Sequence, residues 1–105
     1  MVELNKENFE AEVLQAEGKV LVDFNSDGCV PCAALMPFIE KCAEEYGDKI
    51  KFTSLNITTA RRLAIAQRVL GLPVIAIYEN GVKIEELVKD DATEINIEAM
   101  IKRHI

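Results

Sequence analysis

The feature that most restricts the fold is a short, almost continuous apolar run, KVLVDF, at Lys19–Phe24. A strand with apolar side chains on both faces is typical of a sheet that helices cover on both sides. The segment after it has helical periodicity, with Leu35, Ile39 and Tyr46 on one face and Gly47 as the expected end. A layered α/β fold is therefore the first expectation.

Further elements are expected on both sides of this strand and helix. Their order, βαβαββα after a short strand over Val2–Leu4, indicates a central sheet flanked by helices. Because 105 residues contain neither a repeat nor a linker, we expect one domain over residues 1–105. The expected elements are a helix over 6–18 capped by Asn5, a strand over Ile50–Ile57, a helix over 60–70 capped by Thr58 or Thr59, and a final helix over Thr93–His104.

A hairpin near the C-terminus is the clearest local signal. Two strand-like segments, Pro73–Glu79 and Val82–Val88, are separated only by Asn80–Gly81. An Asn-Gly pair between such segments is typical of a tight antiparallel turn. The sheet is therefore expected to be mixed, parallel in its first half and antiparallel at the hairpin.

Charge and hydropathy narrow the classes of function. The net charge of −6 disfavours nucleic acid as a partner, and Arg61, Arg62 and Arg68 fit a solvated helix face better than a binding patch. No apolar run approaches the roughly 20 residues of a membrane span, and the polar N-terminus does not resemble a signal peptide. We therefore expect a cytoplasmic protein, in which a cysteine pair is more often catalytic or metal-binding than a permanent bridge.

The motif Cys29-Val-Pro-Cys32 follows the buried strand directly. A helix is expected to begin close to Cys29, with Pro31 in its first turn, where a missing N–H is tolerated. The spacing brings both sulfurs to one side of the helix, and the free amides at the helix start favour the Cys29 thiolate. We interpret Cys29 as the attacking sulfur and Cys32, one turn deeper and less acidic, as the resolving one.

Two other uses of the pair are weighed against redox chemistry. A zinc site would need Cys42 and His104 as further ligands, but Cys42 lies on an apolar helix face and His104 in a solvated, frayed end. Met36, like Cys42, is expected to pack in or near the core. A static disulfide would close too small a loop to stabilise the fold much. Redox chemistry without a metal is favoured.

Asp23 and Pro73 are the other residues with chemical potential. Asp23 lies within the buried strand, so its pKa should rise; it is either a satisfied buried carboxylate or a proton carrier for Cys32. Pro73 either starts its strand or, with a cis peptide bond, fixes a tight turn at the rim of an active site.

With these parts in place, the chain resembles the thioredoxin family over essentially its whole length. The matching stretches are VLVDF, CVPC followed by Pro37, SLNI, GLPV and ENG. The resemblance implies a thioredoxin-like sandwich and an enzyme that reduces protein disulfides by dithiol exchange through Cys29 and Cys32. It also implies no cofactor beyond that redox-active disulfide, a monomer, and recycling by a flavin-containing thioredoxin reductase.

The same resemblance assigns further site residues. It implies that Asp23 is the buried carboxylate and that Pro73 is cis beside the disulfide. The backbone of Leu72 would pair with an extended segment of the substrate. The implied substrate groove comprises Gly28, Val30, Pro31, Gly71, Leu72, Val88 and Lys89.

Five positions depart from the family pattern. Gly28 and Asn25 stand where the family has tryptophans, Val30 and Lys89 where it has glycines, and Ser54 where many members have a lysine near Asp23. Partner choice therefore stays open. The alternatives are a dedicated electron carrier to a specific reductase or peroxidase, a glutaredoxin-like role, and a non-catalytic binding module of the same fold.

Overall fold

Five strands form one mixed sheet at the centre of the computed structural model, which describes residues 1–105. The order across the sheet is β1-β3-β2-β4-β5. The pairs β1–β3 and β3–β2 are parallel, and β2–β4 and β4–β5 are antiparallel, which confirms the expected mixed sheet. The strands are β1 (Val2–Leu4), β2 (Lys19–Asn25), β3 (Lys51–Asn56), β4 (Val74–Glu79) and β5 (Val82–Val88).

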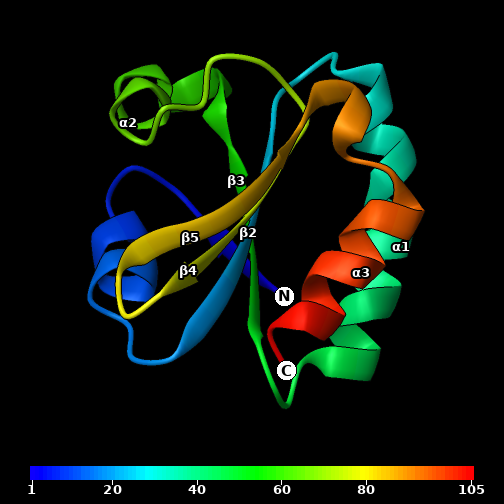
Figure 1. Cartoon of the computed structure of the whole chain (residues 1–105). Coiled ribbons are helices and arrows are strands. Elements are labelled where there is room, and N and C mark those ends of the chain that lie inside the picture. The colour runs from blue at the N-terminus through cyan, green and yellow to red at the C-terminus, as the bar shows by residue number, and fades with distance from the viewer.

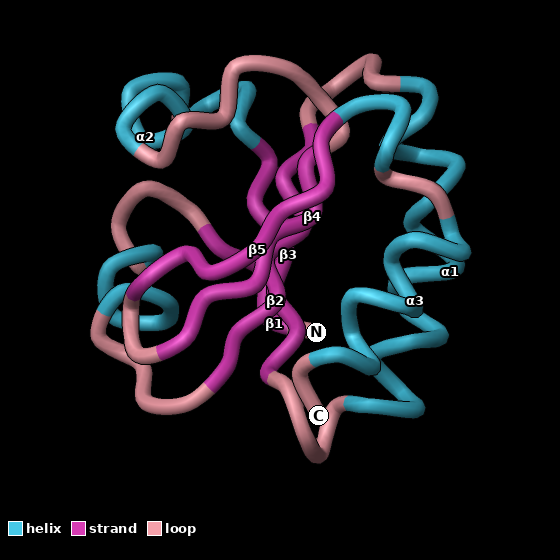
Figure 2. Tube along the Cα trace, viewed as in Figure 1, coloured by secondary structure: helices cyan, strands magenta, loops and turns pink.

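Helices cover both faces of this sheet, as Figures 1 and 2 show. One face carries the long helix α1 (Val30–Tyr46) and the C-terminal helix α3 (Glu94–Arg103). The other carries a short π-helix, η1 (Glu10–Leu14), a 3-10 turn, η2 (Ile57–Thr59), and α2 (Arg61–Ala66). A last 3-10 turn, η3 (Lys89–Asp91), joins β5 to α3. The sheet therefore separates the apolar core into two layers, one beneath each set of helices.

Strand β2 supplies side chains to both layers, which explains its continuous apolar sequence. Val20, Val22 and Phe24 belong to the core beneath η1 and α2. Leu21 belongs to the core beneath α1 and α3, which also contains Ile39 and Cys42 of α1. Because side chains alternate along a strand, Asp23 faces the α1 layer together with Leu21. A carboxyl group is thus built into an otherwise apolar layer.

The first helix differs from its expected form. Asn5 does cap a turn, because its Oδ1 accepts the N–H groups of Glu7 and Asn8, each at 2.9 Å. The segment then continues as the π-helix η1 rather than as an α-helix, and its Gln15 N–H donates to Glu10 O at 2.8 Å. The expected helix over 6–18 was therefore too long and of the wrong type.

The start of α2 is a second correction. Asn56, and not Thr58 or Thr59, caps the chain here, because Asn56 Oδ1 accepts the Thr58 N–H at 2.9 Å. The Thr58 hydroxyl is already engaged, since it accepts the N–H of Asp27 at 2.9 Å. The result is the turn η2, after which α2 begins at Arg61 without a side-chain cap and ends at Ala66.

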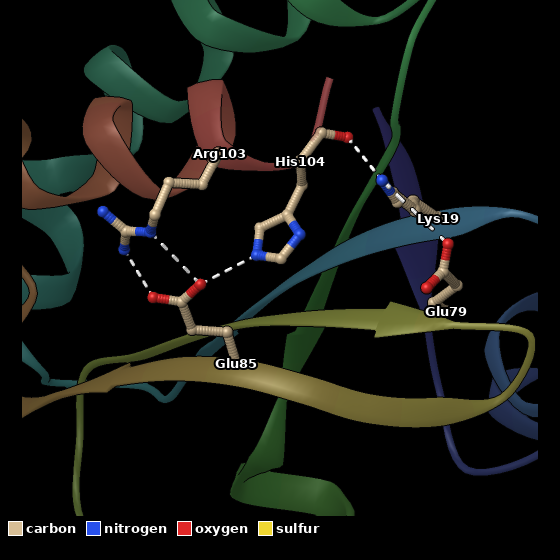
Figure 3. Close-up of polar contacts among 5 residues, drawn as sticks. All are labelled: Lys19, Glu79, Glu85, Arg103 and His104. Atoms are coloured by element: carbon tan, nitrogen blue, oxygen red, sulfur yellow. Dashed lines mark hydrogen bonds and ion pairs between the residues drawn. The ribbon is translucent and has the colours of Figure 1, made fainter.

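The C-terminal end of α3 is docked on the sheet, contrary to the expectation of a frayed, solvated tail (Figure 3). His104 Nε2 lies 2.7 Å from Glu85 Oε1 on β5, and its side chain is only 18% exposed. Arg103 pairs with the same carboxylate. Lys19 on β2 donates to the His104 carbonyl oxygen at 2.8 Å. These contacts fix α3 against the edge strand of the sheet.

Candidate active site

The cysteine pair lies where β2 passes into α1. Gly28, with a φ of +76°, turns the chain there, a conformation that glycine adopts without steric cost. Cys29 is the cap residue of α1, and Pro31 lies in its first turn, as expected. The Cys29 and Cys32 side chains form a disulfide with a Cα–Cα distance of 5.3 Å. The two sulfurs therefore lie on the same side of the helix start.

The two cysteines differ in exposure and in hydrogen bonding. Cys32 is buried, at 3% exposure, whereas Cys29 is half-buried. The N–H of Cys32 donates to Cys29 Sγ at 3.3 Å. An amide of the first helical turn thus points at the more accessible sulfur, where it would stabilise negative charge.

A pocket of about 410 Å³ lies beside the disulfide. Both cysteines of the pair line it, together with Gly28 and Val30 of the residues assigned to the groove. Val30 is 77% exposed, so its branched side chain stands free next to the reactive sulfur. Met36, expected to pack in or near the core, is half-buried and also lines this pocket. The complete lining is Asn25, Ser26, Gly28, Cys29, Val30, Cys32, Ala33 and Met36.

Asp23 is the buried charged residue of the structure, with 2% exposure. Burial raises the pKa of its carboxyl from 3.8 to about 7, and the Asn25 side chain opposes the rise more weakly. Its Oδ2 atom has no hydrogen-bond partner in the protein, so no donor stabilises negative charge on that atom. A carboxyl with such a pKa can both accept and release a proton near neutral pH.

The peptide bond between Leu72 and Pro73 is cis. Pro73 is buried, and its carbonyl oxygen accepts the N–H of Lys89 at 2.8 Å. In the strand register Val74 lies between Phe24 of β2 and Val88 of β5. Pro73, just before Val74, therefore lies at the end of the sheet where β2 finishes and the chain continues to the cysteines.

The residues assigned to the groove come from two sides. Gly28 and Val30 line the pocket, and Pro31 is exposed beside them. The others do not line that pocket but gather at the adjoining ends of β4 and β5, where Gly71 and Leu72 are half-buried and Val88 and Lys89 exposed.

Asn25 has a role in the site that the sequence did not suggest. Its Nδ2 donates to Ser54 Oγ at 2.9 Å. Asn25, two residues after Asp23 on β2, also lines the pocket beside the disulfide. The sequence signal for this role was its position, two residues after a buried carboxylate and at the end of the same strand. No group of three or more histidine, cysteine, aspartate or glutamate side chains in the structure is arranged to hold a metal ion.

A cysteine pair at the start of a helix, with a cis-proline at the same end of a mixed sheet, is the arrangement of the class of thiol–disulfide oxidoreductases. The thioredoxin family profile matches residues 1–103. The chain is 57% identical to a thioredoxin of Peptoclostridium acidaminophilum over 105 residues, all of this chain and 96% of the relative. It is 59% identical to a thioredoxin of Acetoanaerobium sticklandii, with both chains covered in full.

A solved structure gives the same assignment of the fold. The thioredoxin of Malassezia sympodialis (Mala s 13) superposes with a TM-score of 0.87 at 25% identity, covering 99% of this chain and 90% of that one. The chain belongs to the thioredoxin family. It is accordingly an enzyme that reduces protein disulfides through its own disulfide-forming cysteine pair.

Proposed function

We propose that this thioredoxin acts as a monomeric, cytoplasmic reductant of partner-protein disulfides and is recycled by a flavin-containing thioredoxin reductase. The assignment of roles to the two cysteines rests on how they differ in exposure and in hydrogen bonding. Cys29 is half-buried and receives a helix-start N–H, whereas Cys32 is buried. The more accessible and better stabilised sulfur is the one suited to attack.

The first half of the reaction is an attack by the Cys29 thiolate on one sulfur of a substrate disulfide. The substrate S–S bond breaks as the bond between Cys29 and that sulfur forms. The other substrate sulfur leaves as a thiolate and takes up a proton. The product is a mixed disulfide in which one substrate sulfur is a free thiol and the other is still bonded to Cys29. The substrate is fully reduced only when this mixed disulfide is resolved.

The second half releases the substrate. Cys32 loses its proton and attacks Cys29 Sγ, which forms the Cys29–Cys32 disulfide and expels the second substrate thiolate. Asp23, whose pKa lies near 7, is proposed to accept the Cys32 proton. In total two electrons and two protons pass from the dithiol to the substrate, and the reductase must return both.

Substrate docking is proposed at the cis-proline end of the sheet. Leu72, a half-buried residue, precedes the cis bond, and its backbone is proposed to pair with an extended substrate segment. Gly28, Val30, Pro31, Gly71, Val88 and Lys89 would surround the bound segment. Both tryptophans of the usual family pattern are absent, and this favours a narrow set of partners, such as one dedicated reductase or peroxidase.

Mixed-disulfide capture tests the roles of the two cysteines. Cys32→Ser should form covalent adducts with partner proteins in cell extract, because the resolving step is blocked. The control Cys29→Ser/Cys32→Ser should form none. Adducts on Cys32 in a Cys29→Ser protein would reverse the assigned roles. The absence of adducts with Cys32→Ser under turnover conditions would refute the assignment. A few adducts would indicate a dedicated carrier, and many a general reductant.

Purified donors test the recycling step. With a flavin-containing thioredoxin reductase and NADPH, the oxidised protein should be reduced and should sustain turnover of a disulfide substrate. Glutathione alone should not sustain it. Efficient turnover with glutathione would instead support the glutaredoxin-like alternative.

A further inference from the structure

We propose that Lys89 is a specificity-determining residue that favours disulfide partners with an acidic side chain next to the attacked cysteine. The inference rests on the proposed docking of substrate at the cis-proline end of the sheet. It concerns which substrates are taken rather than the exchange chemistry itself.

The Lys89 side chain lies across the loop that leads into the cis bond. A Cβ built on Gly71 would come within 2.1 Å of Lys89 Cε and 3.1 Å of Lys89 Nζ. The aliphatic stem therefore occupies the space above the Gly71 Cα. Because the Lys89 N–H also donates to Pro73 O at 2.8 Å, both its backbone and its ammonium are held beside the docking segment.

The backbone of Lys89 is one that its side chain does not favour. Its φ is +54°, in the left-handed region that glycine adopts readily and that most other residues avoid. Asn80 and Arg68 also have a positive φ, but the hairpin turn explains the first and the turn that ends α2, in which the Val69 N–H donates to Ala64 O at 2.8 Å, explains the second. No turn of that kind accounts for a lysine at position 89. Strained residues of this sort are found preferentially at functional sites, which supports a role for the side chain.

The ammonium of Lys89 is free to bind a partner. None of the five ion pairs in the structure involves Lys89. The other charged groups nearest to it in the chain are Asp90 and Asp91, and Asp27 precedes the cysteines; none of them forms an ion pair either. In a chain with a net charge of −6, Lys89 is a positive group at the cis-proline end of the sheet that could attract an acidic partner, whereas Arg61 lies on the other side of the cysteines, with Ser26 and Asp27.

Matched peptides test the proposal. Three disulfide-linked reporter peptides would be identical except for Asp, Ser or Lys directly after the reacting cysteine. At low ionic strength we expect kcat/KM to be roughly two- to tenfold higher for the Asp peptide than for the Lys peptide, because the two peptides differ by one attractive and one repulsive exposed charge pair, each worth about 1.4- to 5-fold. The ratio should approach one as the Debye length falls from about 30 Å at 0.01 M salt to about 3 Å at 1 M.

Variants assign the effect to one side chain. In Lys89→Gln the Asp-to-Lys ratio should fall to one or below, because the acidic Asp90 and Asp91 are then the nearest charges along the chain. Lys89→Glu should invert it. Lys41→Gln, which removes one exposed charge about 16 Å along α1 from the helix start, should keep the wild-type ratio. An unchanged ratio in Lys89→Gln, or a wild-type ratio near one at low salt, would overturn the proposal.

Two further variants separate this effect from folding and from function. Lys89→Gly removes the side chain and suits the positive φ, so it should fold at least as stably and lose the discrimination. Gly71→Ala should weaken the discrimination in the wild type, where it displaces the Lys89 stem, but not in Lys89→Gly. If the wild-type protein reduces none of the three peptides, the proposed function fails. If it reduces all three with one rate in every variant, only the inference about Lys89 fails.

Discussion

Ser54 in β3 is the register partner of Asp23 in β2, so the two side chains lie next to each other on the face covered by α1. Ser54 provides no charge, and its hydroxyl accepts a hydrogen bond from Asn25 at 2.9 Å. Asp23 is therefore surrounded by neutral groups and apolar side chains. The lack of a cation beside it is one reason why burial dominates its pKa.

A lysine at position 54 should lower the pKa of Asp23 from its value of about 7. An ammonium next to the carboxylate stabilises the charged form, and an opposite charge within a few ångströms typically shifts a pKa by about 1–3 units. The measurement is the titration of the Asp23 carboxyl carbon by NMR in the oxidised protein. Ser54→Met controls for added bulk without charge. An equal shift in both variants would contradict the electrostatic explanation.

Replacement of Asp23 by alanine should stabilise the oxidised protein increasingly as the pH rises. The folded-state pKa lies above the unfolded value of 3.8, so between about pH 4 and 7 the unfolded chain ionises first and wild-type stability falls. The gain of Asp23→Ala over wild type should therefore grow by up to about 4 kcal/mol from pH 4 to pH 9. The free energy lost because the shorter alanine side chain leaves a cavity does not depend on pH. Denaturant unfolding at several pH values measures the slope, and a flat difference would exclude the raised pKa.

Cys42 should be inert in the folded, oxidised protein. Its side chain is 2% exposed, and burial raises the pKa of its thiol to about 11, so almost no thiolate forms at pH 8. A thiol reagent should therefore find no reactive group in the native oxidised protein and one in denaturant. A Cys42→Ala variant, which should show none in either condition, identifies the thiol. Rapid native labelling would mean that this part of α1 opens readily.

Removal of the Glu85 carboxylate should loosen the C-terminal end of α3. Arg103 and His104 both contact it and lower its pKa, with Arg103 contributing most. Glu85→Gln should reduce the free energy of unfolding by about 1 kcal/mol at low salt and by less at high salt. In the wild type this stabilisation is present above the unfolded pKa and is lost as the pH falls through the lowered folded pKa. Glu3→Gln, on the other edge strand β1 and outside all the ion pairs, is the matched control, and an equal loss there would contradict the contact-specific explanation.

Local sequence signals predicted much of the fold. The apolar run at Lys19–Phe24, the Asn-Gly turn and the proline after Cys29 each act within a few residues, so β2, the hairpin and the start of α1 were placed correctly. The errors arose where distant residues compete. Thr58 lost its capping role because its hydroxyl binds the backbone of Asp27. His104 is docked because Glu85, nineteen residues earlier, meets it across the sheet.

The site was predictable in its reactive groups and less so in its surroundings. The cysteine spacing and the apolar neighbours of Asp23 indicated their chemistry directly, because both depend on local sequence. The cis bond at Pro73 followed only from the family resemblance. The position of the Lys89 stem over Gly71 depends on how η3 packs against the end of β4, which no local pattern encodes.

The N–H of Cys32 already points at Cys29 Sγ while the two cysteines are joined. That amide belongs to the first turn of a 17-residue helix and could not change direction without unwinding it. The dipole that would stabilise the reduced sulfur is thus oriented before any electron arrives, so we expect the protein to contribute little reorganisation energy to each cycle. Oxidised and reduced forms should then share nearly one shape, and a partner would have to distinguish them by charge.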